Sequence, residues 1–514
     1  MTWTDGYISE VSYVNNYHVE LSPSHIYLSL VNGGFEPARL ENFNYLELGF
    51  GQGISLNVHA AGNDGTFWGI DFNPEQTASA QEMSLFCGNE AIILDDSFEE
   101  FSKKTDIPDF DFIVLHGIWS WISEENRDFI IKILRSKLKP GGAVYLSYNT
   151  IPGWSPAIPL RHLIYKYAEH LGTRDQGIQE RIGKSLEFAK RLAQTDNPYF
   201  AANPTIAERL EKLFGMSKSY LAHEFFNKDW EPTPFSAVAE KLESAKLSFA
   251  ASANYLDAID SINLSKESIE ILTEFNDPII KETIKDFCVN QQFRKDIFIR
   301  GGKKLNRYEL VEKLSRIRFT LIQDPSLIEL TIQGIRGSGD LKEEIYRPII
   351  EHLHKDSSYT SSIANLERAL KGEADVFAIW QALFILKAKN AVSLTLSNKT
   401  IAKRKERCRR LNDYLLYKSR SHKDIAVVSN PVTGSGISLS HIEKIFVRLL
   451  LDRVTGPDAL ARECYKKLKE RDETLTLKEK KVTDETEAVN ELTNEAKKFL
   501  EVIYPTLQRL SICD

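Results

Sequence analysis

Three glycines at every second position follow a short apolar run, residues 45–48, near the start of the chain. They are Gly49, Gly51 and Gly53. Because glycine has no side chain, such a loop lets the backbone turn sharply and approach a ligand closely. A second apolar run, residues 66–70, ends in Asp71, whose carboxylate suits the hydroxyls of a ribose. This order of strand, glycine loop, helix, strand and acid predicts a nucleotide-type site at the carboxyl ends of parallel strands.

The spacing of the glycines indicates which nucleotide the site would take. A dinucleotide fingerprint has its third glycine three residues after the second, but here that position is Ile54. A tighter loop with Glu47 at the strand end suits a ligand that has no pyrophosphate. S-adenosylmethionine, which combines an adenosine with a charged amino acid, fits this description, and we expect it to be the cofactor.

Polar residues also end the next two apolar runs, 91–94 and 110–115. They are Asp95, Asp96, Ser97, His116 and Gly117. One of the two aspartates would accept a hydrogen bond from the adenine amine, and the sequence alone does not decide between them. The predicted cofactor-binding residues are Glu47, Gly49, Phe50, Gly51, Gly53, Asp71, Phe72, Asp96, Ser97, His116 and Gly117.

Aromatic residues gather after the fourth and fifth predicted strands. They are Trp119, Trp121, Tyr148 and Trp154. Beside a methyl donor, such rings could hold a cationic amine by cation–π attraction, while Tyr148 and Asn149 could hydrogen-bond it. Methyl transfer needs alignment and desolvation more than covalent help from the protein. The alternative is that the aromatic residues pack the base of an insertion.

A polar pair, His223 and Glu224, interrupts the apolar segment 221–226. It is either a buried structural pair or a part of the active site, and the sequence leaves both open. The candidate catalytic residues are Tyr148, Asn149, Trp119, Trp121, Trp154, His223 and Glu224. We expect no metal site, because the five cysteines are widely scattered and lack paired spacing.

Alternating strands and helices position these residues. Short strands separated by amphipathic helices predict an α/β fold, a Rossmann-like parallel sheet with helical insertions. Two late strands, 248–254 and 293–299, should pair as an antiparallel hairpin at the sheet edge. The expected early strands are 44–48, 66–70, 91–94, 110–115 and 143–147, and the helices include 54–61, 73–83, 124–138, 161–171, 176–193 and 206–214.

Five regions follow from this reading. They are an N-terminal helical segment (1–40), an S-adenosylmethionine-binding core (41–154), a helical lid insertion (155–230), a completion of the sheet (231–302) and a mainly helical C-terminal domain (303–514). The first segment contains Tyr7, Tyr13 and Tyr17 and is interpreted as packing against the core; a flap over the ligand is the alternative.

The composition excludes several classes of protein. The chain has 514 residues and a net charge of −7, so no overall basic field points to nucleic acid. The basic run 403–410 is interrupted by Glu406 and is interpreted as a solvated helix face rather than a nucleic-acid site. With no run approaching about 20 apolar residues, no signal-peptide pattern and scattered cysteines, we expect a cytoplasmic protein without membrane insertion.

Several segments resemble bacterial class I methyltransferases that carry a methyltransferase regulatory domain, and among them the rickettsial type of protein-lysine methyltransferase. The segments are Leu46–Gly49, His116–Trp121, Tyr145–Trp154, Leu221–Glu224, Phe293–Gly301 and Asn430–Gly436. The resemblance implies a class I methyltransferase sheet and methylation of lysine ε-amino groups. Its best-known substrates are outer-membrane surface proteins, and the resemblance also allows a homodimer. Methylation of a small molecule or saccharide, and a non-catalytic cofactor-binding scaffold, are the alternatives.

Overall fold

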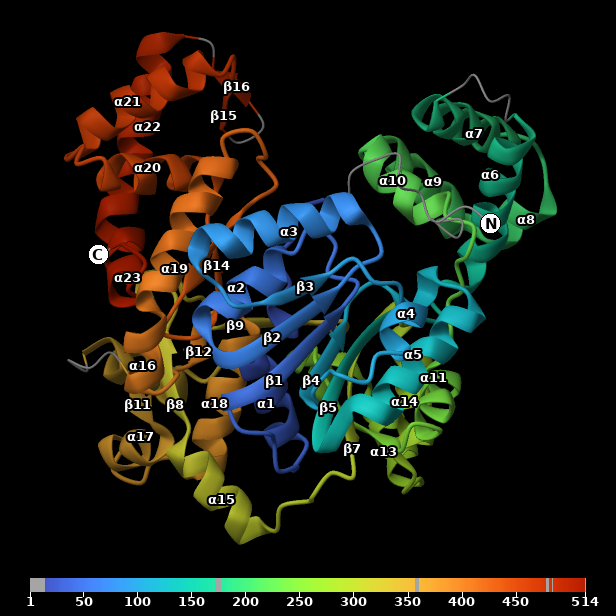
Figure 1. Cartoon of the computed structure of the whole chain (residues 1–514), viewed down its shortest axis with the longest axis horizontal. Coiled ribbons are helices and arrows are strands. Elements are labelled where there is room, and N and C mark those ends of the chain that lie inside the picture. The colour runs from blue at the N-terminus through green and yellow to red at the C-terminus, as the bar shows by residue number, and fades with distance from the viewer. Residues whose placement is uncertain (1–13, 172–176, 356–359, 478–479, 483, 514) are drawn as a thin grey trace.

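A seven-stranded sheet forms the centre of the molecule (Figure 1). The computed structural model describes residues 14–171, 177–355, 360–477, 480–482 and 484–513. Strands β1 to β5 run parallel, whereas β7 is antiparallel to both β5 and β6, so the expected antiparallel pair at the sheet edge is confirmed. The order is β3-β2-β1-β4-β5-β7-β6, with β1 (Glu41–Leu48), β2 (Asp64–Ile70), β3 (Ile92–Leu94), β4 (Phe110–Leu115), β5 (Leu138–Asn149), β6 (Leu247–Ser252) and β7 (Phe293–Arg300).

Helices cover both faces of the sheet, with α1 and α2 on one face and α5 and α11 on the other. The sequence sets their ends directly. In α3, Pro74 occupies the first position, the Asn73 side chain accepts the N–H of Glu75, and Gly88 ends the helix in the left-handed conformation. The helices are α1 (Pro23–Asn32), α2 (Ile54–Gly62), α3 (Pro74–Cys87), α4 (Phe98–Ser102), α5 (Glu124–Lys137) and α11 (Phe235–Glu243).

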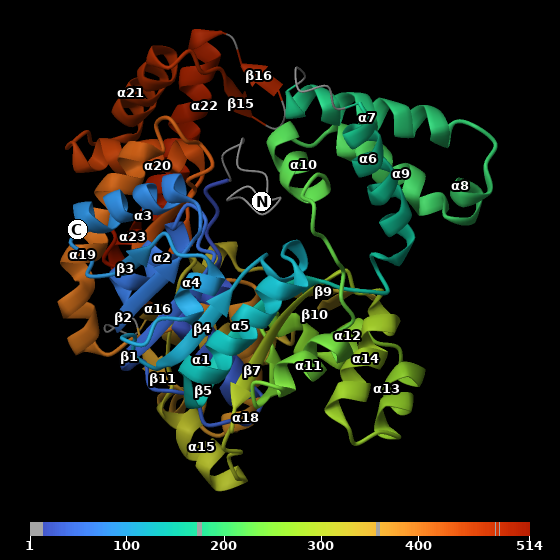
Figure 2. The same ribbon diagram turned by 45° about the vertical axis from the view of Figure 1, so that its right-hand side comes forward.

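A helical lid follows β5 and forms a lobe of its own, clearly separate from the sheet in both views (Figures 1 and 2). Apolar faces of its helices meet in one cluster that also includes Trp154 and Phe226. The predicted insertion at 155–230 therefore corresponds to a lobe with its own small core. Its helices are α6 (Ile158–His170), α7 (Ile178–Ala193), α8 (Pro198–Ala202), α9 (Pro204–Phe214) and α10 (Lys218–Phe225).

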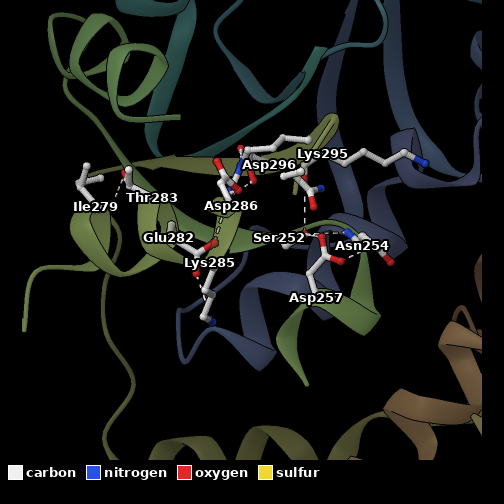
Figure 3. A network of polar contacts seen from close by, with 12 residues as sticks. Ser252, Asn254, Asp257, Ile279, Glu282, Thr283, Lys285, Asp286, Lys295 and Asp296 are labelled. Atoms are coloured by element: carbon white, nitrogen blue, oxygen red, sulfur yellow. Dashed lines mark hydrogen bonds and ion pairs between the residues drawn. The ribbon is translucent and has the colours of Figure 1, made fainter. Parts of the chain in front are cut away.

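A buried ionic network joins α14 to β7 beside the sheet (Figure 3). Arg294 on β7 binds Asp296 through two nitrogens, at 2.7 and 2.9 Å. It also reaches Asp286 at 2.5 Å and Glu282 at 2.9 Å on α14. Burial raises the pKa of Asp286 to about 7, because the Arg294 charge offsets only part of the desolvation. The helices of this region are α12 (Asp260–Asn263), α13 (Lys266–Thr273) and α14 (Pro278–Val289).

The C-terminal region is mainly helical, as expected, but it also contains short strands that the sequence analysis did not anticipate. These are β8 (Arg318–Leu321), β9 (Thr331–Gly334), β10 (Gly337–Asp340), β11 (Ser361–Ser362), β12 (Val392–Leu394), β13 (Val427–Asn430), β14 (Ser435–Ser438), β15 (Leu475–Leu477) and β16 (Lys480–Val482). The helices are α15 (Arg307–Arg316), α16 (Glu343–Lys355), α17 (Ile363–Ala369), α18 (Val376–Ala388), α19 (Asn398–Lys418), α20 (His441–Leu451), α21 (Pro457–Glu470), α22 (Glu485–Lys498) and α23 (Tyr504–Arg509).

Helix α19 packs against α2 and α3 through a shared apolar cluster that includes Val58 and Leu411. The basic run lies on this helix. Arg404 is buried and binds Asp64 at 2.8 Å, whereas Arg409 and Arg410 are exposed, so the interpretation as a solvated face is wrong for Arg404. Among the helices of the described ranges, none combines the length and apolarity needed to cross a membrane.

Candidate active site

A cavity of about 860 Å³ lies between the carboxyl ends of the parallel strands and the lid. It is large enough for a nucleotide-sized ligand together with part of a second molecule. Parallel strands that alternate with helices present their loops at one edge, which explains why distant segments meet here. All the predicted cofactor-binding residues line the cavity: Glu47, Gly49, Phe50, Gly51, Gly53, Asp71, Phe72, Asp96, Ser97, His116 and Gly117.

The glycine loop needs glycine for two physical reasons. Gly49 and Gly53 have φ values of +70° and +72°, in the left-handed region that other residues adopt at a cost. In addition, a Cβ at Gly49 would lie 2.4 Å from Cδ1 of Ile118, and one at Gly53 would lie 2.4 Å from Cβ of Ala80. The loop therefore keeps its tight path, and the cavity wall here is backbone.

Asp71 ties this loop to the end of β2. Its two carboxylate oxygens accept the N–H of Gly51 at 2.9 Å and of Asn73 at 3.0 Å. A carboxylate has about four acceptor positions, so it keeps capacity for a ligand. Burial raises the pKa of Asp71 to about 6, although the two backbone N–H groups favour the charged form.

Glu47 is a second buried acid in the cavity wall. Its Oε2 accepts the hydroxyl of Tyr45 at 3.2 Å. Burial raises the pKa of Glu47 to about 8, and the nearby Asp71 charge adds to this rise. Glu47 is therefore mostly protonated at neutral pH, and a cation beside it would favour its ionised form.

A pair of histidines forms another part of the wall. The ring of His116 stacks on that of His18 with centroids 3.8 Å apart, and its Nδ1 lies 2.8 Å from the hydroxyl of Tyr145. Burial lowers the pKa of both histidines, so both rings are neutral at physiological pH. Val14, Asn16, His18 and Leu21 line the cavity, as the alternative of a flap predicted, whereas Ile26 and Leu30 of α1 pack against the sheet, so the described part of this segment does both. Tyr7 and Tyr13 lie outside the described residues.

The structure separates the two candidate aspartates after β3. Asp96 lines the cavity and pairs with Lys104 at 3.0 Å, whereas Asp95 is exposed and does not line it. Ser97 begins α4 in a capping box with Glu100. The geometry therefore favours Asp96 over Asp95 for the contact with the adenine of the cofactor.

Two of the candidate catalytic residues, Tyr148 and Trp119, do not reach the cavity. Tyr148 is fully buried and donates its hydroxyl to Asp296 at 2.7 Å. Successive strand residues point to opposite faces of a sheet, so Asn149 faces the cavity and Tyr148 faces away from it. Trp119 packs into the core beneath α5 and α11. We therefore withdraw Tyr148 and Trp119 as residues that touch an acceptor.

The remaining candidates form the wall opposite the glycine loop. Asn149, Trp121, Trp154, His223 and Glu224 all line the cavity. Burial raises the pKa of Glu224 to about 7, against the lowering effect of Arg161 and Arg209. The lid thus brings Glu224 to the cavity that the glycine loop, Trp121 and Trp154 also line.

Carboxyl groups dominate the charge of the cavity. Arg209 is the single Lys or Arg among the lining residues that the structure describes. Such an excess of acidic groups attracts cationic ligands. The lining acids are Glu47, Asp71, Asp96, Glu99, Glu125, Glu224 and Asp229.

Comparison with known proteins identifies a family model and relatives that match this chain. Residues 217–300 match the family described as the predicted methyltransferase regulatory domain. An uncharacterised protein of Synechocystis sp. is 35% identical over 516 residues, which cover 100% of both chains. This chain belongs to the same family as the Synechocystis protein, and its residues 217–300 form the region that matches the predicted methyltransferase regulatory domain. An uncharacterised protein of Rickettsia prowazekii is 29% identical over 334 residues, 63% of this chain and 58% of that protein.

A solved structure shares the fold of this chain over almost its whole length. PKMT2 of Rickettsia typhi, in complex with AdoHcy, superposes with a TM-score of 0.70 at 19% identity. The match covers 97% of this chain and 99% of that one. The class I methyltransferase sheet, the lid and the C-terminal region therefore form one shared architecture.

Several residues that line the cavity were not predicted from the sequence, and those that come from the N-terminal segment and the lid include Asn16, His18, Arg209 and Tyr220. None of them follows a strand of the central sheet, so strand-end reasoning could not find them. They reach the cavity because the N-terminal segment and the lid fold over it. The apolar periodicity of α9 pointed to a helix but not to the contact of its polar face with the cavity.

Proposed function

We propose that this protein transfers methyl groups from S-adenosylmethionine to lysine ε-amino groups of a protein substrate. The observation that carries the proposal is a single cavity with two unlike walls. One wall has the glycine loop and Asp71, and the other has Trp121, Trp154 and the half-buried carboxyl of Glu224. The binding of AdoHcy by PKMT2 of Rickettsia typhi, which has the same fold, supports the choice of cofactor.

The residues on the first wall fit the cofactor. S-adenosylmethionine supplies an electrophilic methyl group on a positively charged sulfur. Asp71 has unused acceptor positions for ribose hydroxyls, and the glycine loop offers backbone N–H groups without side chains in the way. Glu47 can balance positive charge as it ionises.

The second wall suits an amine that must lose a proton. A lysine ammonium has a pKa near 10.4, so it arrives charged, but only the neutral amine attacks a methyl group. Aromatic faces attract the ammonium, and Glu224, with a pKa of about 7, can accept its proton at physiological pH. Glu224 is therefore the proposed general base.

Transfer of radioactive methyl groups tests this function. The protein is incubated with labelled S-adenosylmethionine and a lysate of its source cells, and labelled gel bands are hydrolysed to amino acids. We expect labelled N-methyllysine. Label confined to the small-molecule fraction would show a small acceptor instead, and tight cofactor binding without any transfer would show a scaffold.

Replacing Glu224 by Gln should lower kcat/KM about 10²- to 10⁴-fold, the usual contribution of a general base. In the wild type, kcat/KM should rise as the pH increases through about 7, since Glu224 accepts a proton only when it is ionised. The Glu224→Gln variant should lose that rise. Glu187→Gln, an exposed carboxyl on α7 of the same lid, is the matched control. Equal losses in both variants, or an unchanged pH profile, would contradict the role.

Cofactor binding should release protons from Glu47 near pH 7. Burial holds the pKa of Glu47 at about 8, and a bound positive charge lowers that pKa, so the proton leaves. Titration calorimetry at pH 7 in buffers of different ionisation enthalpy measures the release. It should diminish at pH 9, where Glu47 is already ionised, and in the Glu47→Gln variant. Equal proton release by the wild type and Glu47→Gln would contradict the assignment.

A further inference from the structure

A positively charged side chain of this protein stacks on the ring of Trp154. The guanidinium of Arg209, on α9, lies 3.8 Å from the centre of the Trp154 ring. Both residues line the cavity, and Trp230 packs against Trp154 in a T-shaped arrangement, with ring centroids 5.1 Å apart. The contact is therefore a cation–π stack in the acceptor half of the site.

Arg209 has no hydrogen bond or ion pair among the described residues, in contrast to the buried arginines Arg127, Arg161 and Arg294. Arg294 binds three carboxylates, and Arg127 pairs with Glu124 and Glu231. Arg161 stacks on Trp230 at 4.6 Å, but it also donates to the carbonyl of Asn227 at 2.9 Å and does not line the cavity. The stack on Trp154 is thus the main contact that holds the Arg209 head group.

The surroundings of Arg209 favour its exchange for another cation. Glu224 is close enough for its charge to act on Arg209, yet the two form no ion pair, and Glu224 itself has no hydrogen bond within the described ranges. Desolvation lowers the pKa of Arg209. When the Arg209 guanidinium leaves the Trp154 ring, it regains its hydration. An incoming ammonium then makes a cation–π contact with the ring and an ionic contact with the Glu224 carboxylate.

We propose that the cavity-facing side of Trp154 is the binding place of the acceptor ammonium, and that Arg209 is a resident cation which the acceptor side chain must displace. This rests on the proposed function, because it names the ligand class of the same site: a primary alkylammonium. Arg209 then acts as an internal competitor and sets the KM for the acceptor. It takes no part in the chemical step.

A binding experiment without any methyl donor tests this directly. Quenching of tryptophan fluorescence is followed as n-butylammonium chloride replaces potassium chloride at constant ionic strength, at pH 8.5, where Glu224 is ionised. Arg209→Gln should bind n-butylammonium about 2- to 30-fold more tightly than wild type, the range of one cation–π contact. Arg209→Lys, which keeps a competing cation, should stay within about twofold of wild type. Arg191→Gln, an exposed arginine on α7, removes the same charge from the lid and should change nothing.

Two further measurements make the result decisive. Binding of 1-butanol, the neutral analogue, should gain less than that of n-butylammonium in Arg209→Gln. In a Trp154→Phe background, with a weaker cation–π partner, the gain from Arg209→Gln should shrink. If labelled transfer to lysine is established, Arg209→Gln should lower KM for the protein acceptor, measured at pH 8.5 because the Arg209 charge also lowers the pKa of Glu224.

Several outcomes would overturn the proposal. They are weaker or unchanged n-butylammonium binding in Arg209→Gln, an equal gain for 1-butanol, and a gain that persists undiminished in Trp154→Phe. Failure of the proposed function is seen separately, as a lack of labelled methyllysine, because the binding measurements require no transfer.

Discussion

Replacing Asp71 by Ala should abolish measurable binding of S-adenosylmethionine, with a loss of at least about 100-fold in affinity. The carboxylate would make charge-assisted hydrogen bonds to the ligand, each contributing about 1.5–3 kcal/mol. It also fixes the N–H groups of Gly51 and Asn73, so the substitution loosens the loop as well as removing a contact. Titration calorimetry measures the loss.

Two other variants separate these effects. Asp71→Asn keeps an acceptor oxygen but loses the charge, so it should bind with intermediate affinity. Asp95→Ala removes an exposed acid that also follows a strand but does not line the cavity, and its affinity should equal that of the wild type. An Asp71→Ala protein that binds the cofactor normally would show that the cofactor lies elsewhere.

Replacing Arg294 by Met should destabilise the protein by about 3–5 kcal/mol, the usual effect of removing one partner from a buried ionic cluster. Asp296, Asp286 and Glu282 would then share a site that has lost its central cation (Figure 3). Tyr148 would keep its hydrogen bond to Asp296, but that carboxylate would lack a counter-charge. Unfolding in urea, followed by fluorescence and circular dichroism, measures the loss.

Asp286→Asn is the matched control for this network. The pKa of Asp286 in the folded protein, about 7, lies above its unfolded value near 3.9. Its contribution to stability is therefore fully present below pH 4 and is lost as the pH rises through 7. At pH 6 the side chain is mostly neutral, so Asp286→Asn should cost less than about 1 kcal/mol and should flatten the decline in stability between pH 4 and 7. An Asp286→Asn loss as large as that of Arg294→Met would contradict this account.

The sequence predicts the donor side of the site far better than the acceptor side. Gly49, Asp71, Asp96 and His116 follow parallel strands, and all such strand ends meet at one edge of a sheet, so their order along the chain fixes their meeting place. The acceptor side has no such rule. Tyr148 and Asn149 are neighbours in sequence, and only the register of β5 decides which of them faces the cavity.

Residues outside the sheet depend on tertiary packing that no local pattern reveals. His18 and Arg209 come from segments on either side of the core, and neither has a spacing that indicates a site. The short strands of the C-terminal region were not predicted from the sequence for a different reason. Strands such as β11 and β12 have two or three residues, too few for an alternating pattern to be visible.

Helix α2, which begins at the glycine loop, is buried at every position because it lies between the sheet and the C-terminal region. Asn63, just after it, donates to the carbonyl of Gly434 at 2.5 Å, and the loop 430–436 thereby closes over the end of the helix. The C-terminal third therefore helps to fix the position of α2, the helix that begins at the glycine loop. A substitution in the loop 430–436 would therefore act on the glycine loop through α2, without touching any residue that lines the cavity.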